Sequence, residues 1–170
     1  MNKNTGFREI TPYETENALK LIGKDWMLIT AKDNDKANAM TASWGCLGVL
    51  WNKPVAVCFI RPQRYTFELV QKEERISLAF LDDTYKSALN LCGTRSGREC
   101  DKLALAGLTV SDVDGVPVIN EARLALVCRK LYVDSLNESS FLDSSLKSFY
   151  KDGDYHAFYV LEIEKTLIKD

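Results

Sequence analysis

The stretch "NAMTASWGCLGVLW", residues 38–51, joins an alternating apolar pattern to small polar side chains. Because successive side chains of a strand point to opposite faces, the pattern predicts two faces: Met40, Ala42 and Trp44 on one, and Ala39, Thr41 and Ser43 on the other. Gly45 follows, and glycine in a strand is typical of a close backbone approach. The stretch predicts a core strand with a small hydrogen-bonding face for a ligand. An amphipathic strand with its polar face in water fits the same pattern.

Length and composition indicate one soluble globular domain. The chain has 170 residues, of which 46% are hydrophobic and 27% are charged. This length is sufficient to bury a core without disulfides or metals. The net charge of -2 lacks the strongly basic character of nucleic-acid-binding domains. We therefore expect no nucleic-acid partner.

The N-terminal sequence and the cysteines are typical of a cytoplasmic protein. The N-terminal "MNKNTGFREITPYE" has no apolar core of a signal peptide, and no apolar run reaches membrane-spanning length. We therefore expect a cytoplasmic protein without a membrane partner. The five cysteines form no CxxC pair, and His156 is the single histidine, so the sequence predicts mostly buried cysteines and no metal site.

The hydrophobic pattern is mostly that of strands. Strands are expected at 25–33, 53–61, 75–81, 122–136 and 155–168. Helical spacing occurs at 66–74 and, interrupted by a loop at 92–97, at 85–105, whereas 113–120 reads as a turn and a short extended segment. The Ser/Asp-rich segment 137–154 is expected to cross the surface. Without a regular βαβ order, this pattern favours an antiparallel barrel or sandwich with helices outside.

The segment "RPQRYTFE", residues 61–68, stands where a strand ends and a helix begins. Free backbone N–H groups at a helix start favour an anion, and Arg61 and Arg64 add two guanidinium groups. Thr66 adds a hydroxyl in the first turn. These residues predict a phosphate site, and a solvated arginine pair at an ordinary helix start fits them equally well.

Two further segments carry candidate binding residues. In "GTRSGRECDKLALAG", residues 93–107, Ser96 and Gly97 could present a hydroxyl and backbone amides, while Arg98 and Lys102 supply positive charge. A flexible surface loop before a capped helix is the alternative. In "GDYHAFYVLEI", residues 153–163, His156 opens the last expected strand, where a structural or merely exposed histidine is the alternative to a catalytic one.

Taken in this order, the four segments resemble the flavin reductase-like family, which includes the flavoredoxins. The resemblance covers about residues 25–164. It implies a single flavin reductase-like domain over residues 1–170. The implied fold is mainly β with α: an FMN-binding split β-barrel, antiparallel and of Greek-key type, with peripheral helices.

The resemblance also implies a site. Residues lining the flavin would be Thr41, Ala42, Ser43 and Trp44, and those holding the phosphate and ribityl chain would be Arg61, Arg64, Tyr65 and Thr66. Ser96 and Gly97 would lie near the ring, Lys102 would contribute to cofactor binding, and His156 would face the nicotinamide side as the catalytic candidate.

The implied function is that of an FMN-dependent NAD(P)H oxidoreductase. NADH or NADPH would be the co-substrate, and electrons would pass through bound FMN to free flavin or another acceptor. A flavoredoxin-type electron carrier, reduced by a protein partner, is the alternative, and a split barrel without cofactor is a third. The resemblance further implies a homodimer with FMN near the interface.

Overall fold

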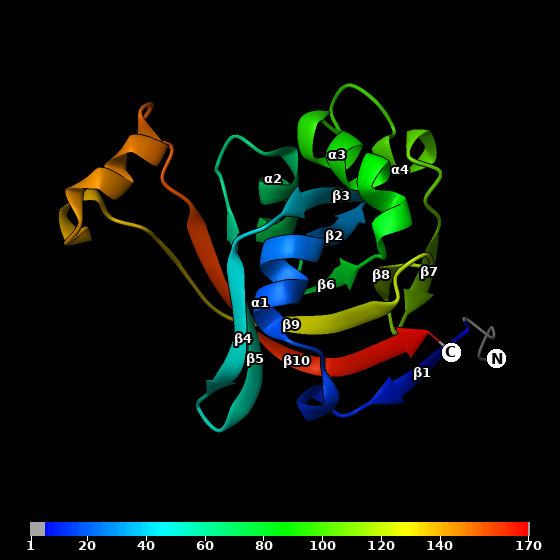
Figure 1. Ribbon diagram of the computed structural model, residues 1–170. Coiled ribbons are helices and arrows are strands. Elements are labelled where there is room, and N and C mark those ends of the chain that lie inside the picture. Colours follow the sequence, from blue (N-terminus) through cyan, green and yellow to red (C-terminus); the bar gives the residue numbers. More distant parts are fainter. Residues whose placement is uncertain (1–5, 170) are drawn as a thin grey trace.

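The fold is an antiparallel barrel, seen in a computed structural model that describes residues 6–169 (Figure 1). Residues 1–5 and 170 of the expected domain lie outside the described residues. The main sheet has eight strands in the order β3-β2-β6-β9-β10-β5-β4, with β1 paired to β10. Its strands are β1 (Phe7–Ile10), β2 (Met27–Asp33), β3 (Lys36–Ala42), β4 (Gly45–Leu50), β5 (Lys53–Ile60), β6 (Arg75–Phe80), β9 (Leu124–Ser135) and β10 (Ala157–Lys169). Among the described residues β3 and β4 end this order, so hydrogen bonds do not close the barrel. The predicted split barrel is confirmed.

Helices and short turns lie around the barrel. They are α1 (Ala18–Lys20), which continues into a π-helix at Leu21–Asp25, α2 (Tyr65–Lys72), α3 (Lys86–Thr94) and α4 (Lys102–Leu105). Short 3₁₀ turns lie at Pro12–Glu14, Asp83–Tyr85, Glu138–Ser140 and Ser144–Tyr150. Both α3 and α4 pack against β3, and α2 packs against β2. Within the described residues, no helix is long and apolar enough to cross a membrane.

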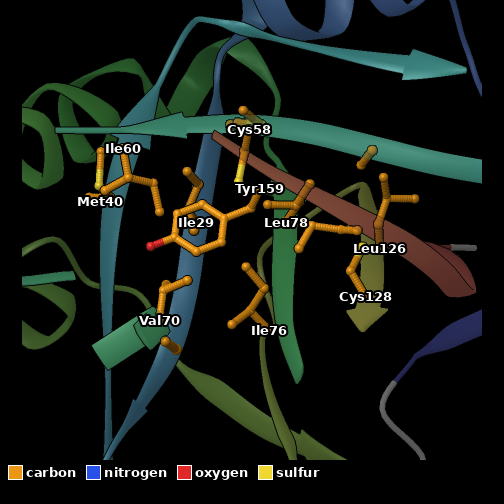
Figure 2. Packing of buried hydrophobic residues seen from close by; sticks show 14 of the residues in the cluster. Ile29, Met40, Cys58, Ile60, Val70, Ile76, Leu78, Leu126, Cys128 and Tyr159 are labelled. Carbon is orange, nitrogen blue, oxygen red and sulfur yellow. The ribbon is translucent and has the colours of Figure 1, made fainter. Parts of the chain in front are cut away.

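Two apolar clusters hold these layers together. The first fills the barrel, where Tyr159 lies among Ile29, Ile60, Val70 and Ile76 (Figure 2). The second lies on the other face of the sheet and joins it to α3, α4 and the hairpin of β7 (Val110–Val113) and β8 (Val116–Ile119). Burial of apolar surface on this scale is the main stabilising contribution in a domain of this size.

The stretch 38–51 forms two strands instead of one. The predicted alternation holds as far as β3 runs, since Met40 lies in the barrel interior and Ala39 in the second cluster. However, β3 ends at Ala42, and the chain turns at residues 43–44 before β4 begins at Gly45. The prediction that Ser43 and Trp44 continue the alternation is therefore wrong. The turn carries the chain from one end of the sheet to the other.

Four other features differ from the prediction. The strand expected from residue 25 begins at Met27, because Trp26 has a φ of 68° and Leu21–Asp25 form the π-helix. The loop expected from residue 92 begins later, because α3 continues to Thr94. Residues 113–120 belong to a complete β7–β8 hairpin. The short strand β1 was not predicted from the sequence. It pairs with β10.

Candidate functional site

Two adjoining pockets share one arginine, Arg64. The first, here the aromatic pocket, has a volume of about 220 Å³ and is lined by Met40, Thr41, Ala42, Ser43, Trp44, Phe59, Arg61, Arg64 and His156. The second, here the cationic pocket, has a volume of about 160 Å³ and is lined by Gln63, Arg64, Tyr65, Thr66, Thr94, Arg95, Ser96, Gly97 and Lys102. The fold thus brings every residue that the resemblance implies for the site to one pocket or the other.

A buried lysine, Lys102, and a part-buried arginine, Arg64, meet at the end of α3 in the cationic pocket. Arg64 donates from Nη1 to the carbonyl of Gly93 at 2.8 Å and from Nη2 to that of Cys92 at 3.3 Å. Lys102 is 3% exposed, and its Nζ donates to the same Cys92 carbonyl at 3.2 Å. These bonds satisfy carbonyls at a helix C-terminus, where the helix dipole favours positive charge.

The two cations have no carboxylate partner. Within residues 6–169 neither Arg64 nor Lys102 takes part in a salt bridge. Burial lowers the pKa of Lys102 and the pKa of Arg64 from their ordinary values, because desolvation disfavours the charged form. Buried charges are normally paired. The cationic pocket therefore has the electrostatic character of an anion site.

The loop before α4 closes against α2 at a point that only glycine permits. A Cβ on Gly97 would lie 2.2 Å from Oδ1 of Asn38 and 2.8 Å from Cδ1 of Tyr65. The same Asn38 donates from Nδ2 to the hydroxyl of Thr66 at 2.8 Å, and both side chains are buried. Asn38 thus joins β3, α2 and the loop. Asn38 was not predicted as a site residue. A polar side chain within an apolar strand was the sequence feature that could have indicated its role.

The arginines of the segment 61–68 have different surroundings. The side chain of Arg61 forms an ion pair with Asp154 and donates to the carbonyl of Phe149 at 2.9 Å. It lines the aromatic pocket, whereas Arg64 lines both pockets. Both arginines line the aromatic pocket, but Asp154 already compensates Arg61, and the binding of one anion by the two arginines stays a prediction. Arg98 lies outside both pockets, paired with Glu68.

His156 lies within a group of aromatic rings. Its ring centroid is 5.1 Å from that of Trp44, 6.4 Å from Phe59 and 5.5 Å from Tyr150. The Tyr150 hydroxyl and His156 Nδ1 are 2.9 Å apart. Burial, followed by the charge of Arg61, lowers the pKa of His156 to about 4, so the imidazole is neutral at pH 7.

The segment 137–154, here the arm, supplies part of this aromatic group. It extends away from the barrel in Figure 1, and its end returns so that Phe149 packs edge-on against Trp44 at 5.6 Å. Tyr150 is buried although most of the arm is exposed. Phe59, Phe149 and Tyr150 were not predicted as site residues. The sequence feature that could have indicated the last two is the pair of adjacent aromatic residues in "SFY", residues 148–150, within an otherwise Ser/Asp-rich segment.

Acid should destabilise the protein through His156. In the unfolded chain this group titrates near its ordinary pKa of 6.5, whereas in the folded protein the pKa is about 4. Between these values only the unfolded state takes up the proton, so the free energy of unfolding should fall by about 1.4 kcal/mol per pH unit. Urea denaturation of the native protein and of His156→Gln from pH 7.5 to 4.5 measures this. The variant should lack that part of the slope, and parallel profiles would contradict the assignment.

Several solved structures share this fold. An FMN-binding domain of a flavin reductases-like enzyme from Shewanella baltica matches 96% of this chain and 77% of its own, with 14% identity and a TM-score of 0.70. The FMN-binding protein from Thermus thermophilus matches 83% and 69%, with 24% identity and a TM-score of 0.65. The flavoredoxin from Methanosarcina acetivorans matches 84% and 67%, with 25% identity and a TM-score of 0.65.

The sequence comparisons are consistent with the fold. No sequence among curated proteins matches this chain. The family model described as the flavin reductase like domain matches residues 20–168, which include both pockets and the arm. The protein therefore belongs to the flavin reductase-like family.

Proposed function

We propose that this protein is an FMN-binding oxidoreductase that acts as an NAD(P)H-dependent flavin reductase. One observation carries the proposal: buried Lys102 and part-buried Arg64, neither with a carboxylate partner among residues 6–169, adjoin a pocket walled by small and aromatic side chains. FMN has this combination of a phosphate dianion and a planar apolar ring. Membership of the flavin reductase-like family and the FMN-binding structural relatives support the same cofactor.

The residues present fit the phosphate of FMN. Arg64 and Lys102 supply charge-assisted donors, and the hydroxyls of Thr66 and Ser96 line the same pocket. A dianion there would compensate the charges of buried Lys102 and part-buried Arg64, which have no carboxylate partner among the described residues. Arg64 also lines the aromatic pocket, so a ligand spanning both pockets would contact it along its length.

The aromatic pocket fits a flavin ring. Thr41, Ala42 and Ser43 are small and leave room beside β3, and Trp44 adds an aromatic wall that is 42% exposed. The chemistry that FMN supplies when bound is acceptance of a hydride from NAD(P)H and transfer of its two electrons to free flavin or another acceptor. The protein's own part is to hold the ring, to exclude water with its aromatic side chains, and to offer a neutral imidazole at His156.

Reduction of the bound flavin tests this function. The purified protein, loaded with FMN and kept anaerobic, should lose its visible flavin absorbance when NADH or NADPH is added. Dithionite serves as the control that the flavin is reducible. A flavin that dithionite bleaches and neither nicotinamide bleaches would overturn the reductase proposal.

A flavoredoxin-type electron carrier is the second candidate. The similarity to the Methanosarcina acetivorans flavoredoxin, at 25% identity, favours it. In that case a protein reductase, and not NAD(P)H, would bleach the bound flavin. A protein that stays colourless after incubation with FMN would instead favour a split barrel without cofactor.

We further propose that two copies associate with the site near their interface. Exposed apolar residues gather on β4 and its turn, on the end of β9 and on the arm: Val49, Leu50, Trp51, Tyr132, Val133, Leu142, Leu146 and Phe149. Neighbouring exposed apolar side chains, such as Trp51 and Tyr132 with ring centroids 6.5 Å apart, are typical of an interaction surface. Because Phe149 also packs on Trp44, a partner covering the arm would border the aromatic pocket. Sedimentation velocity should give the mass of a dimer.

A further inference from the structure

We propose that Tyr150 is a positioning residue that holds the imidazole proton of His156 on Nε2. The imidazole would then offer an N–H donor, not an acceptor, to a ligand in the aromatic pocket. The use of this donor by a substrate rests on the proposed reductase function, whereas the position of the proton does not.

The hydrogen bond between the two side chains has one favourable direction. Tyr150 and His156 are each 7% exposed, and Oη and Nδ1 are 2.9 Å apart. If Nδ1 carried the proton, it would donate to Oη and leave the buried phenol hydrogen without an acceptor among residues 6–169. If the phenol donates to a bare Nδ1, the phenol hydrogen has an acceptor, and the remaining donor, Nε2–H, is not fully buried. Since a buried donor without an acceptor is costly, the second arrangement is favoured.

The arm holds Tyr150 in place for this bond. Its ring stacks on Tyr155 with centroids 4.8 Å apart and an interplanar angle of 25°. Phe141 packs on it at 5.8 Å, and the guanidinium of Arg61 lies 5.3 Å from its centroid. Contacts on several sides restrict the phenol to few orientations. The hydroxyl is therefore preorganised toward His156 by residues that do not themselves line the pocket, apart from Arg61.

The remaining nitrogen determines what ligand the imidazole can recognise. His156 lines the aromatic pocket, and Tyr150 occupies its Nδ1, which leaves Nε2. A fixed Nε2–H favours a ligand that places a carbonyl or carboxamide oxygen beside an aromatic ring. A ligand that presents a donor at this point would leave two hydrogens facing each other. The tautomer thus contributes to specificity through hydrogen-bond polarity.

Nitrogen NMR tests the position of the proton directly. The full chain contains a single histidine, so long-range ¹H–¹⁵N correlations from its ring carbon-bound protons give one unambiguous pattern. At pH 7.5 the native protein should show a protonated Nε2 and a bare Nδ1. Tyr150→Phe keeps the ring and removes the hydroxyl, so it should show a mixture of both tautomers. A native protein with the proton on Nδ1 would overturn the proposal without any variant being needed.

The matched control is Tyr155→Phe, which removes a hydroxyl from the neighbouring stacked ring and should leave the tautomer unchanged. A Tyr150→Phe spectrum identical to that of the native protein would likewise overturn the proposal. At saturating FMN, Tyr150→Phe should raise KM for NAD(P)H about five- to tenfold and change kcat less. A changed tautomer with an unchanged KM would refute the role of the donor in substrate recognition. Failure of NAD(P)H to reduce the flavin would refute the reductase function, and the NMR result would still decide where the proton lies.

Discussion

Replacing Arg64 by alanine is expected to weaken FMN binding by about 10- to 150-fold, which corresponds to about 1.5–3 kcal/mol for hydrogen bonds to a charged group. Arg64 is the one residue that lines both pockets, and no carboxylate competes for its charge within the described residues. Its removal would leave buried Lys102 and exposed Arg95 as the cations that line the cationic pocket. Titration of the protein into FMN, followed by flavin fluorescence, measures the change.

Comparison with riboflavin separates a phosphate effect from general damage to the pocket. Riboflavin has the same ring and ribityl chain and lacks the phosphate. The native protein should prefer FMN, and Arg64→Ala should remove most of that preference while changing riboflavin affinity little. An equal loss for both flavins would show that Arg64 supports the pocket without binding phosphate.

Arg98→Ala is the matched control for this prediction. Arg98 belongs to the same surface region, but it pairs with Glu68 and lies 5.1 Å from the ring centroid of Tyr65, outside both pockets. Its removal deletes an equal charge without deleting a pocket residue. FMN affinity should therefore stay within about twofold of the native value, since exposed ion pairs contribute little. A loss as large as that of Arg64→Ala would indicate long-range charge in place of direct contact.

The segments predicted to form the site all contribute to the two pockets, and each of these segments lies where a regular element ends. Arg64 precedes α2, Ser96 follows α3, and residues 43–44 follow β3. Strand and helix ends can be read from local hydrophobic periodicity and from turn residues. An antiparallel barrel then gathers these ends in space. Local pattern therefore indicated where the elements end, whereas the resemblance to the flavin reductase-like family assigned these segments to one cofactor site.

What the sequence could not predict depends on contacts between distant segments. Asp154 compensates Arg61 across 93 positions of the chain, and no local feature of "RPQRYTFE" indicates that one arginine is paired and the other is free of carboxylates. Lys102 reads as a solvated side chain in a short amphipathic helix, yet it is buried under the end of α3. Likewise, the arm has the composition of a surface loop, and only its packing reveals Tyr150 as a neighbour of His156.

Gly45→Ala should destabilise the protein strongly, because the prediction of a close backbone approach at Gly45 has a specific structural basis. A Cβ there would lie 2.5 Å from the carbonyl oxygen of Val57 and 3.2 Å from Cε of Met27. Gly45 pairs with Cys58 in the β4–β5 ladder, so the carbonyl cannot move away without breaking strand pairing. We expect a loss of about 2–3 kcal/mol, the upper range for an overpacked site, and a fall in Tm of about 4–10 °C.

For Gly48→Ala in the same strand we expect no loss of stability. Nothing lies within 4 Å of a Cβ at Gly48, which pairs with Val55 three positions further along β4. Alanine should there be neutral or stabilise the fold by about 0.5 kcal/mol, because glycine loses more conformational freedom on folding. Urea denaturation of both variants measures whether each substitution lowers or raises the free energy of unfolding. Equal losses of stability in the two variants would mean that β4 tolerates no added side chain at either position. A loss at Gly45 alone would show that the backbones of β4 and β5 must be in close contact where β4 begins, directly after residues 43–44 of the aromatic pocket.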